Sequence, residues 1–355
     1  MKQIKLFSFV FLGVLMIASP GFAGGAKEEF KPKAEYTMQV NVGPAYDWGI
    51  GAQRWADLIK EKTQGKIIVK PYFGSALLAG KQTNWYQAVA DGAIDFAVES
   101  TINASTVIKS LNLFNLPFFM ATYEDVDKIE NGKAGKKIFE ELEKGGVRCL
   151  AWGENGFRQL TNSKREVKTP ADVAGLKVRV VGSPLFIDIF KQLGADPVNM
   201  NWADAVTAFQ QGVVDGQENP KGVLTTVKIW EYHKYMTNWN YVLDPLIFCL
   251  NMKLWDKYPE DIKKAIQEAA LEAGEYEKAI ARAHLDGDKS INLLKSKYHE
   301  SPPEPFKEAV EKGMIITNLT SSQMQAFKDA TKSLYDKWVP QIGKELYDLA
   351  VADMK

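Results

Sequence analysis

Short β-favouring runs alternate with longer amphipathic segments along this chain, and the alternation occurs twice. In the first part, apolar residues repeat at every second position where a strand is expected and at a helical period where a helix is expected. The expected strands are 36–42, 66–73, 94–98 and 147–152, and the expected helices are 48–62, 81–90 and 135–144. Strands that alternate with helices at this spacing predict a largely parallel α/β sheet.

The same alternation starts again after Trp152. Ser183 and Pro184 are residue types that begin a helix, and Gly194 is a type that follows the end of one. The second set consists of strands at 176–181 and 197–200, helices at 185–193 and 203–211, and a strand-like run at 241–252. We therefore predict a two-lobed α/β fold, with 35–155 plus 245–283 in lobe I and 156–244 plus 284–355 in lobe II.

A long helical run, rich in Ala, Glu and Lys, is expected from Pro259 to about Tyr298. At 1.5 Å per residue, a helix of roughly 40 residues would be ~60 Å long, which exceeds the diameter of one domain. We therefore expect this helix either to span both lobes or to break near Gly274 or Gly287. The remainder, 305–355, is predicted to be helical and amphipathic.

The first 23 residues have the pattern of a secretory signal peptide. Lys2 and Lys5 precede an apolar core at 6–17, and Pro20 breaks the run before the small residues that signal peptidase needs. The apolar core is shorter than the roughly 20 residues that span a bilayer. We predict a soluble protein exported to the periplasm, without membrane insertion of the mature chain.

Charge and motif content exclude several classes of protein. Lys and Arg total 44, and so do Asp and Glu, so the chain has no basic field for nucleic acid. The histidines are scattered, and the chain has no nucleophile elbow, P-loop or dinucleotide motif. We therefore predict no metal, no cofactor and no enzymatic activity. Cys149 and Cys249 each lie in an apolar stretch, which favours buried free thiols, with a long-range disulfide as the alternative.

Arg179 stands in the middle of the strand expected at 176–181, shortly before the start of a helix. In an α/β sheet the carboxyl end of a strand opens into the crevice where ligands bind. A planar guanidinium binds a carboxylate by two parallel charge-assisted hydrogen bonds, and the helix N-terminus at Ser183 and Pro184 adds donors and a favourable dipole. We interpret Arg179 as a clamp for a ligand carboxylate. Taken alone, a structural ion pair is the alternative.

Six further residues are candidates for ligand contact. Arg158 offers a second guanidinium at the junction between the lobes, and Asn219, in a turn expected at 215–220, offers a donor and an acceptor or serves the turn alone. Glu99 follows the strand at 94–98 and either accepts from a ligand hydroxyl or amine or pairs with an arginine. The aromatic candidates, near expected strand–helix junctions or the junction between the lobes, are Trp48, Phe157 and Trp202.

The most specific motifs of the chain fall between 156 and 220. They are Gly156-Phe157-Arg158 with Thr161-Asn162, Thr169-Pro170-Ala171-Asp172 with Gly175-Leu176-Lys177-Val178-Arg179, Leu193-Gly194-Ala195, and the run from Gln211 to Pro220. Together they resemble the periplasmic solute receptors of tripartite ATP-independent periplasmic (TRAP) transporters, of the dicarboxylate-binding type. The resemblance runs from about Tyr36 to the C-terminus.

The resemblance implies a two-lobed receptor that closes on an organic acid, with a long helix across both lobes. In the family, the arginine that corresponds to Arg179 makes the bidentate bond to the ligand carboxylate, and the residues that correspond to Arg158 and Asn219 assist. The resemblance also implies a small and a large membrane permease subunit as partners, driven by an ion gradient. A receptor for an ATP-driven importer or a sensor kinase is the alternative.

One position departs from the family pattern. Where the family commonly has Glu-x-Tyr, this chain has Asp204-Ala205-Val206. Loss of the tyrosine puts the usual C4-dicarboxylate ligand in doubt, and Trp202 and Phe209 suggest a larger or more apolar acid. The sequence does not distinguish one carboxylate from two, or an aliphatic acid from an aromatic one.

Overall fold

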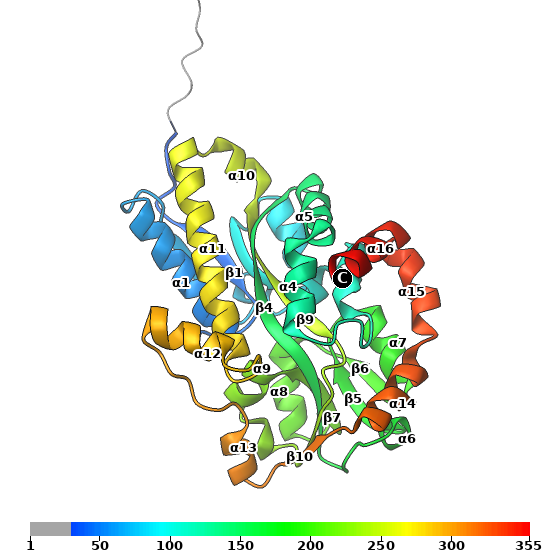
Figure 1. Ribbon diagram of the computed structural model, residues 1–355. Coiled ribbons are helices and arrows are strands. Elements are labelled where there is room, and N and C mark those ends of the chain that lie inside the picture. Colours follow the sequence, from blue (N-terminus) through cyan, green and yellow to red (C-terminus); the bar gives the residue numbers. More distant parts are fainter. Residues whose placement is uncertain (1–29) are drawn as a thin grey trace, which may run out of the picture. The chain divides into compact units, whose positions relative to one another are not determined.

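The sheet of this protein is organised around one long strand, β4 (Val147–Asn162), as Figure 1 shows. The computed structural model describes residues 30–355, and the signal peptide expected at 1–23 lies outside the described residues. Within the described residues, ten strands form one sheet in the order β2-β1-β3-β9-β4-β7-β5-β6, with β8 pairing with the end of β4 and β10 pairing with β8. The other strands are β1 (Tyr36–Val40), β2 (Val69–Tyr72), β3 (Phe96–Ser100), β5 (Lys177–Val180), β6 (Asp196–Asn199), β7 (Gly216–Pro220), β8 (Tyr235–Asn238), β9 (Leu243–Asn251) and β10 (Ile315–Asn318).

The sheet has two halves, which β4 and β9 join. In the first half β1 pairs in parallel with β2 and β3, and in the second half β5 pairs in parallel with β6 and β7. The connecting pairs β3–β9, β9–β4 and β4–β7 are antiparallel. The predicted parallel arrangement is therefore confirmed within each half, whereas the antiparallel centre was not predicted. The residue ranges assigned to lobes I and II stay a prediction, because Pro32–Lys355 form a single compact unit.

β4 is much longer than the strand expected at 147–152. It continues to Asn162 because its first part pairs with β9 and its last part pairs with β7 and β8. Gly156 lies at an irregularity in the β4–β9 register and has φ +114°, a conformation that favours glycine. β4 and β9 also place Cys149 opposite Cys249, and both thiols are buried and free.

Helices surround the sheet and lie close to their expected positions. The helices expected at 48–62, 135–144, 185–193 and 203–211 begin and end within two residues of α1, α5, α7 and α8. No helix of the described residues is both long and apolar enough to cross a membrane. The helices are α1 (Asp47–Lys62), α2 (Trp85–Ala90), α3 (Thr101–Ala104), α4 (Tyr123–Asn131), α5 (Lys133–Lys144), α6 (Pro170–Val173), α7 (Pro184–Gln192), α8 (Trp202–Gln210), α9 (Lys221–Thr226), α10 (Met252–Lys257), α11 (Glu260–Arg282), α12 (Lys289–Leu293), α13 (Lys307–Glu311), α14 (Ser321–Thr331), α15 (Leu334–Ile342) and α16 (Lys344–Asp353).

The long helix α11 ends well before Tyr298, so the expected alternative of one continuous helix to that residue is wrong. The chain leaves the helical conformation at Ala283 and has φ +71° at Gly287, so the break near Gly287 is the correct one of the two expected. Gly274 stays helical, and α11 runs beside α1 and β4 (Figure 1). At the C-terminal end of α11, the Lys221 ammonium group donates to two backbone carbonyl groups, so residues that follow the second half of the sheet contact this helix.

Two expected segments have a different conformation. The turn expected at 215–220 is strand β7, because β4 pairs with it on one side and β5 on the other. Glycine, asparagine and proline are typical turn residues, but here the polar side chains bond to one another inside the protein. The C-terminal region at 305–355 is not entirely helical, because it contains β10, which pairs in parallel with β8.

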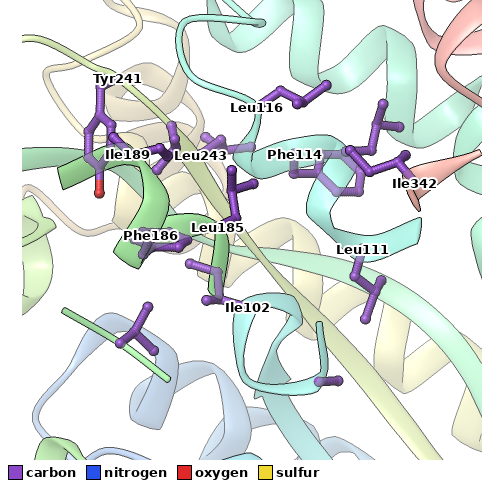
Figure 2. Close-up of a cluster of buried hydrophobic side chains, with 14 of the residues drawn as sticks. Ile102, Leu111, Phe114, Leu116, Leu185, Phe186, Ile189, Tyr241, Leu243 and Ile342 are labelled. Atoms are coloured by element: carbon purple, nitrogen blue, oxygen red, sulfur yellow. The ribbon is translucent and has the colours of Figure 1, made fainter. Parts of the chain in front are cut away.

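One apolar cluster connects helices that follow strands of both halves (Figure 2). It contains Ile102 of α3, Leu185 and Phe186 of α7, and Leu243 of β9. Burial of apolar surface contributes roughly 25 cal/mol per Å², so such a cluster is a major source of stability. Because α3 follows β3 and α7 follows β5, this packing also fixes the carboxyl ends of two strands from different halves.

Replacement of Gly274 by alanine should lower the free energy of unfolding by about 1 kcal/mol, the middle of the net range that the two opposing effects give. Alanine favours a helix over glycine by roughly 1 kcal/mol. However, an added Cβ would lie 2.6 Å from the carbonyl oxygen of Trp152 on β4, and overpacking costs about 1–3 kcal/mol. Chemical denaturation followed by circular dichroism measures the difference.

The control for this variant is Leu271→Ala on the same helix. Leu271 is 56% exposed, so its replacement should change the free energy of unfolding by less than about 0.5 kcal/mol. A Gly274→Ala variant as stable as the wild type would show that the close contact between α11 and β4 does not require glycine.

Candidate functional site

The carboxyl ends of β1, β3, β5 and β7 meet at one small cavity of about 30 Å³. Residues from both halves of the sheet line this cavity, together with residues of the paired strands β4 and β9, which join the halves. This is the place where ligands bind in open α/β sheets. Five of the seven residues predicted to contact a ligand line it, namely Trp48, Arg158, Arg179, Trp202 and Asn219.

Arg179 is buried on β5 and has no carboxylate partner among the described residues. Its Nε and Nη2 atoms donate to the carbonyl oxygen of Met200 at 3.1 and 2.7 Å, and its guanidinium lies 5.5 Å from the centre of the Trp202 ring. Burial lowers the pKa of Arg179 to about 10, because desolvation disfavours the charged form. The group therefore stays positively charged at neutral pH.

Arg158, on β4, is buried as deeply but is paired with two acids. Glu218 accepts from its Nε and Nη2 atoms, and Asp244 accepts from its Nη1 atom at 3.0 Å. Burial disfavours the charged form, but Glu218 and Asp244 outweigh burial and raise the pKa of Arg158 above its usual range. Arg158 thus lines the cavity as a neutralised cation, whereas Arg179 lines it as a free one.

Asn219 lies between Arg158 and a buried chain of polar side chains. Its Oδ1 atom accepts from Nη2 of Arg158 at 3.0 Å, and its Nδ2 atom donates to Gln217 at 2.6 Å. Gln217 in turn donates to Thr161 on β4 at 2.7 Å. Strand β7, rather than a turn, therefore positions the Asn219 amide at the cavity.

The two tryptophans form walls of the cavity. The Trp48 indole donates to the carbonyl oxygen of Val98 at 2.6 Å, which orients its ring. The backbone N–H of Trp202 donates to Oε1 of Gln82 at 2.7 Å, a bond that links α8 to the segment before α2. Phe209, which suggested a larger ligand, packs against Trp202 but does not line the cavity.

The structure does not bring Glu99 and Phe157 to this cavity. Glu99 is buried in β3 and accepts from Gln39 at 3.1 Å, and burial raises the pKa of Glu99 well above its usual range. Phe157 packs against Tyr123 in a different part of the protein, with the ring centres 5.0 Å apart. Ser183, at the N-terminus of α7, is not among the residues that line the cavity, and its hydroxyl faces Ser105 and Asn112.

Sequence reasoning missed most of the polar lining. Asn41 follows β1, and Ser100 ends β3, so the rule that selected Arg179 points to these positions as well. Asn155 lies on β4 and Asp244 on β9, away from the carboxyl ends of these strands, so the rule does not select them. The missed polar residues are Asn41, Gln82, Ser100, Asn103, Asn155 and Asp244.

Asp244 is the acidic residue of the lining. Its carboxylate accepts from the hydroxyl of Ser100 and from the amide of Asn155 at 2.7 Å, in addition to Arg158. Burial raises the pKa of Asp244, and these three donors oppose the rise. Among the described residues, no group of three or more His, Cys, Asp and Glu side chains has a geometry that would hold a metal ion.

Comparisons with known proteins agree with this geometry. The family described as "Bacterial extracellular solute-binding protein, family 7" matches residues 38–290. A solved TRAP periplasmic solute-binding protein from Ralstonia eutropha H16, with bound (S)-2-hydroxy-2-methyl-3-oxobutanoate, is 44% identical with a TM-score of 0.84, over 91% of this chain and 99% of that chain. The 2,3-diketo-L-gulonate-binding periplasmic protein YiaO of Escherichia coli K12 is 31% identical, over 82% of this chain and 84% of the relative.

A further relative, the C4-dicarboxylate-binding periplasmic protein DctP of Rhodobacter capsulatus, is 28% identical, over 86% of both chains. The likeness to solved TRAP receptors confirms the predicted two-lobed α/β fold. The family match covers well over half of the chain. This protein therefore belongs to family 7 of the bacterial extracellular solute-binding proteins, the family of the TRAP solute receptors.

Proposed function

We propose that this protein binds an organic acid by its carboxylate, through Arg179, and delivers the acid to the small and large permease subunits of a TRAP transporter. The observation that carries the proposal is a buried guanidinium that no carboxylate of the described residues neutralises. A buried charge without a counter-ion is costly. A ligand carboxylate supplies the missing counter-ion.

The hydrogen bonds of Arg179 leave room for such a ligand. Its Nε and Nη2 atoms bond to Met200, and Nη1 has no partner among the described residues. A carboxylate that lies against Nη1 and Nη2 would accept two parallel charge-assisted bonds. Arg158 cannot serve in the same way, because Glu218 and Asp244 already occupy its fork.

The relatives support a carboxylic acid as the ligand class. The ligand of the Ralstonia eutropha protein is a hydroxy-oxo acid, and the name of the Escherichia coli relative specifies a sugar acid. The Ralstonia eutropha protein is a TRAP solute-binding protein, which favours a TRAP permease as the partner over an ATP-driven importer or a sensor kinase. The names of both relatives also specify the periplasm, and export of this chain by the signal peptide expected at 1–23 belongs to the proposal.

We infer a binding cycle from the two halves of the sheet. The lobes predicted at 35–155 plus 245–283 and at 156–244 plus 284–355 would open by bending at the paired strands β4 and β9, which join the two halves. The ligand carboxylate would dock on Arg179, and closure would then bring Trp48 and Gln82 against it. Removal of water strengthens the ion pair, because the local dielectric falls.

Replacement of Arg179 by alanine should weaken binding of the acid by about 2–5 kcal/mol, because the carboxylate loses a buried charge partner. Arg179→Lys should also bind more weakly, since an ammonium group cannot form two parallel bonds. A thermal-shift panel of organic acids first identifies the tightest ligand, since a ligand at about 100 times its Kd adds roughly 2.7 kcal/mol of stability. Calorimetry then measures its affinity for each variant.

The control is Arg165→Ala. Arg165 is exposed and donates to backbone carbonyl groups outside the cavity, so its replacement should leave the affinity unchanged. An Arg179→Ala variant that binds within threefold of the wild type would refute the clamp.

Arg158 and Arg179 should differ in their effect on the stability of the ligand-free protein. Arg158→Met leaves Glu218 and Asp244 buried without their cation, which should cost about 3–5 kcal/mol. Arg179→Met leaves no acid unpaired, so it should cost less than half as much. Urea denaturation measures both variants after unfolding and refolding have removed any bound acid, and equal losses would contradict the assignment of Arg158 as the structural cation.

A further inference from the structure

The charges of the cavity lining limit the ligands that it accepts. Of the residues that line it, only Arg158, Arg179 and Asp244 are ionisable at neutral pH. Arg158 is shared between Asp244 and Glu218. When ionised, the group formed by Arg158, Asp244 and Glu218 carries one more negative charge than positive. Arg179 is therefore the one cation of the lining that is available to a ligand.

A second ligand carboxylate would have no cation of its own. It would compete with two buried protein carboxylates for the Arg158 guanidinium, and it would lie in the same cavity as Asp244. Like charges in a buried space repel strongly, because the local dielectric is low. An interface that places like charges together rejects a ligand by several kcal/mol. The lining thus favours ligands with one negative charge.

The uncharged polar groups of the lining indicate what the rest of the ligand is. Among the described residues, Nδ2 of Asn41 and Oδ1 of Asn155 have no hydrogen-bond partner, although Oδ1 of Asn41 accepts from Ser75 and Nδ2 of Asn155 donates to Asp244. One free donor and one free acceptor suit a keto oxygen and a hydroxyl group. A site with such unpaired groups discriminates against an analogue that lacks the matching polar atom.

The size of the cavity sets a limit on chain length. In this conformation its volume of about 30 Å³ is well below the roughly 300–1,000 Å³ that is usual for ligand pockets. The small space therefore favours a short acid over the larger or more apolar one that Trp202 and Phe209 suggested.

We infer that the cavity selects a short monocarboxylate whose other end is uncharged and carries hydroxyl or keto groups, and that Asp244 is the residue that rejects a second carboxylate. The inference rests on the proposed function, because it takes Arg179 as the binding site of the first carboxylate.

The test compares acids of equal length that differ in charge. Succinate and succinamate share a carbon chain, but succinamate has an uncharged amide in place of the second carboxylate. Calorimetric competition against the tightest acid of the panel gives both affinities. Succinamate should bind at least tenfold more tightly than succinate. The inference is overturned if the preference is smaller, or if a dicarboxylate is the tightest acid of the panel.

Asp244→Asn tests the assigned residue. This variant should reduce the preference for succinamate at least tenfold, chiefly by strengthening the binding of succinate. Asp204→Asn is the matched control, since Asp204 is exposed on α8 and does not line the cavity, and it should leave the preference unchanged. An unchanged preference in Asp244→Asn refutes the role of Asp244. If that variant does not fold, the wild-type comparison still decides the charge of the ligand.

A second pair tests the polar end of the ligand. 3-Hydroxybutanoate should bind at least tenfold more tightly than butanoate, and equal affinities overturn this part of the inference. Failure of the inference is distinguishable from failure of the proposed function. A dicarboxylate that binds in an Arg179-dependent manner refutes only the inference, whereas acids that bind equally well to Arg179→Ala refute the proposed function as well.

Discussion

The charge of Arg179 is buried without a carboxylate partner, and this constraint connects the fold to the function. A carbonyl oxygen and the face of an indole ring stabilise the guanidinium in part, but neither replaces a counter-ion. The lowered pKa of Arg179 reflects this deficit. The fold tolerates the deficit because burial of its large apolar core offsets the cost in stability. A ligand that neutralises the charge is therefore bound and at the same time stabilises the folded protein.

Arg158 shows how the same side chain acquires a different role when acids surround it. Its bonds to Glu218 and Asp244 connect three strands, since these residues lie on β4, β7 and β9. The connection lies where the two halves of the sheet meet. The ion cluster therefore fixes strands β4, β7 and β9 as well as one wall of the cavity. Architecture and selectivity thus depend on the same carboxylate, that of Asp244.

The sequence predicted the parts of the fold that rest on local patterns. The prediction of helix α7 was correct because Ser183, Pro184 and Gly194 mark its ends. The position of Arg179 was predicted from the strand in which it lies. Strand β7 was missed, because its Gly, Asn and Pro residues are typical of a turn and only pairing with β4 and β5 makes it a strand. The extent of β4 was missed for the same reason. These features depend on residues that are distant along the chain.

The site was predicted to a similar extent, and for similar reasons. Strand position identified Arg179, and the junction between the lobes identified Arg158, as candidate cations of the site, but neither signal showed which of the two is neutralised. That distinction depends on Asp244, which lies 86 residues from Arg158 along the chain. Glu99 follows the expected pattern of a strand end, yet its side chain faces Gln39 in the sheet interior. The direction of a side chain at a strand end is set by the neighbouring strands, which the sequence alone did not specify.

Trp202 connects the charge of the cavity with the contact between the two halves of the sheet. Its ring covers Arg179, and its backbone N–H bonds to Gln82 from the first half. This N–H belongs to the first turn of α8, where the helix itself provides no acceptor. The bond to Gln82 is therefore available only when the two halves are close. In the proposed binding cycle, a carboxylate on Arg179 and the bond to Gln82 would both fix the position of Trp202. Each would then favour the other, which would couple ligand binding to closure.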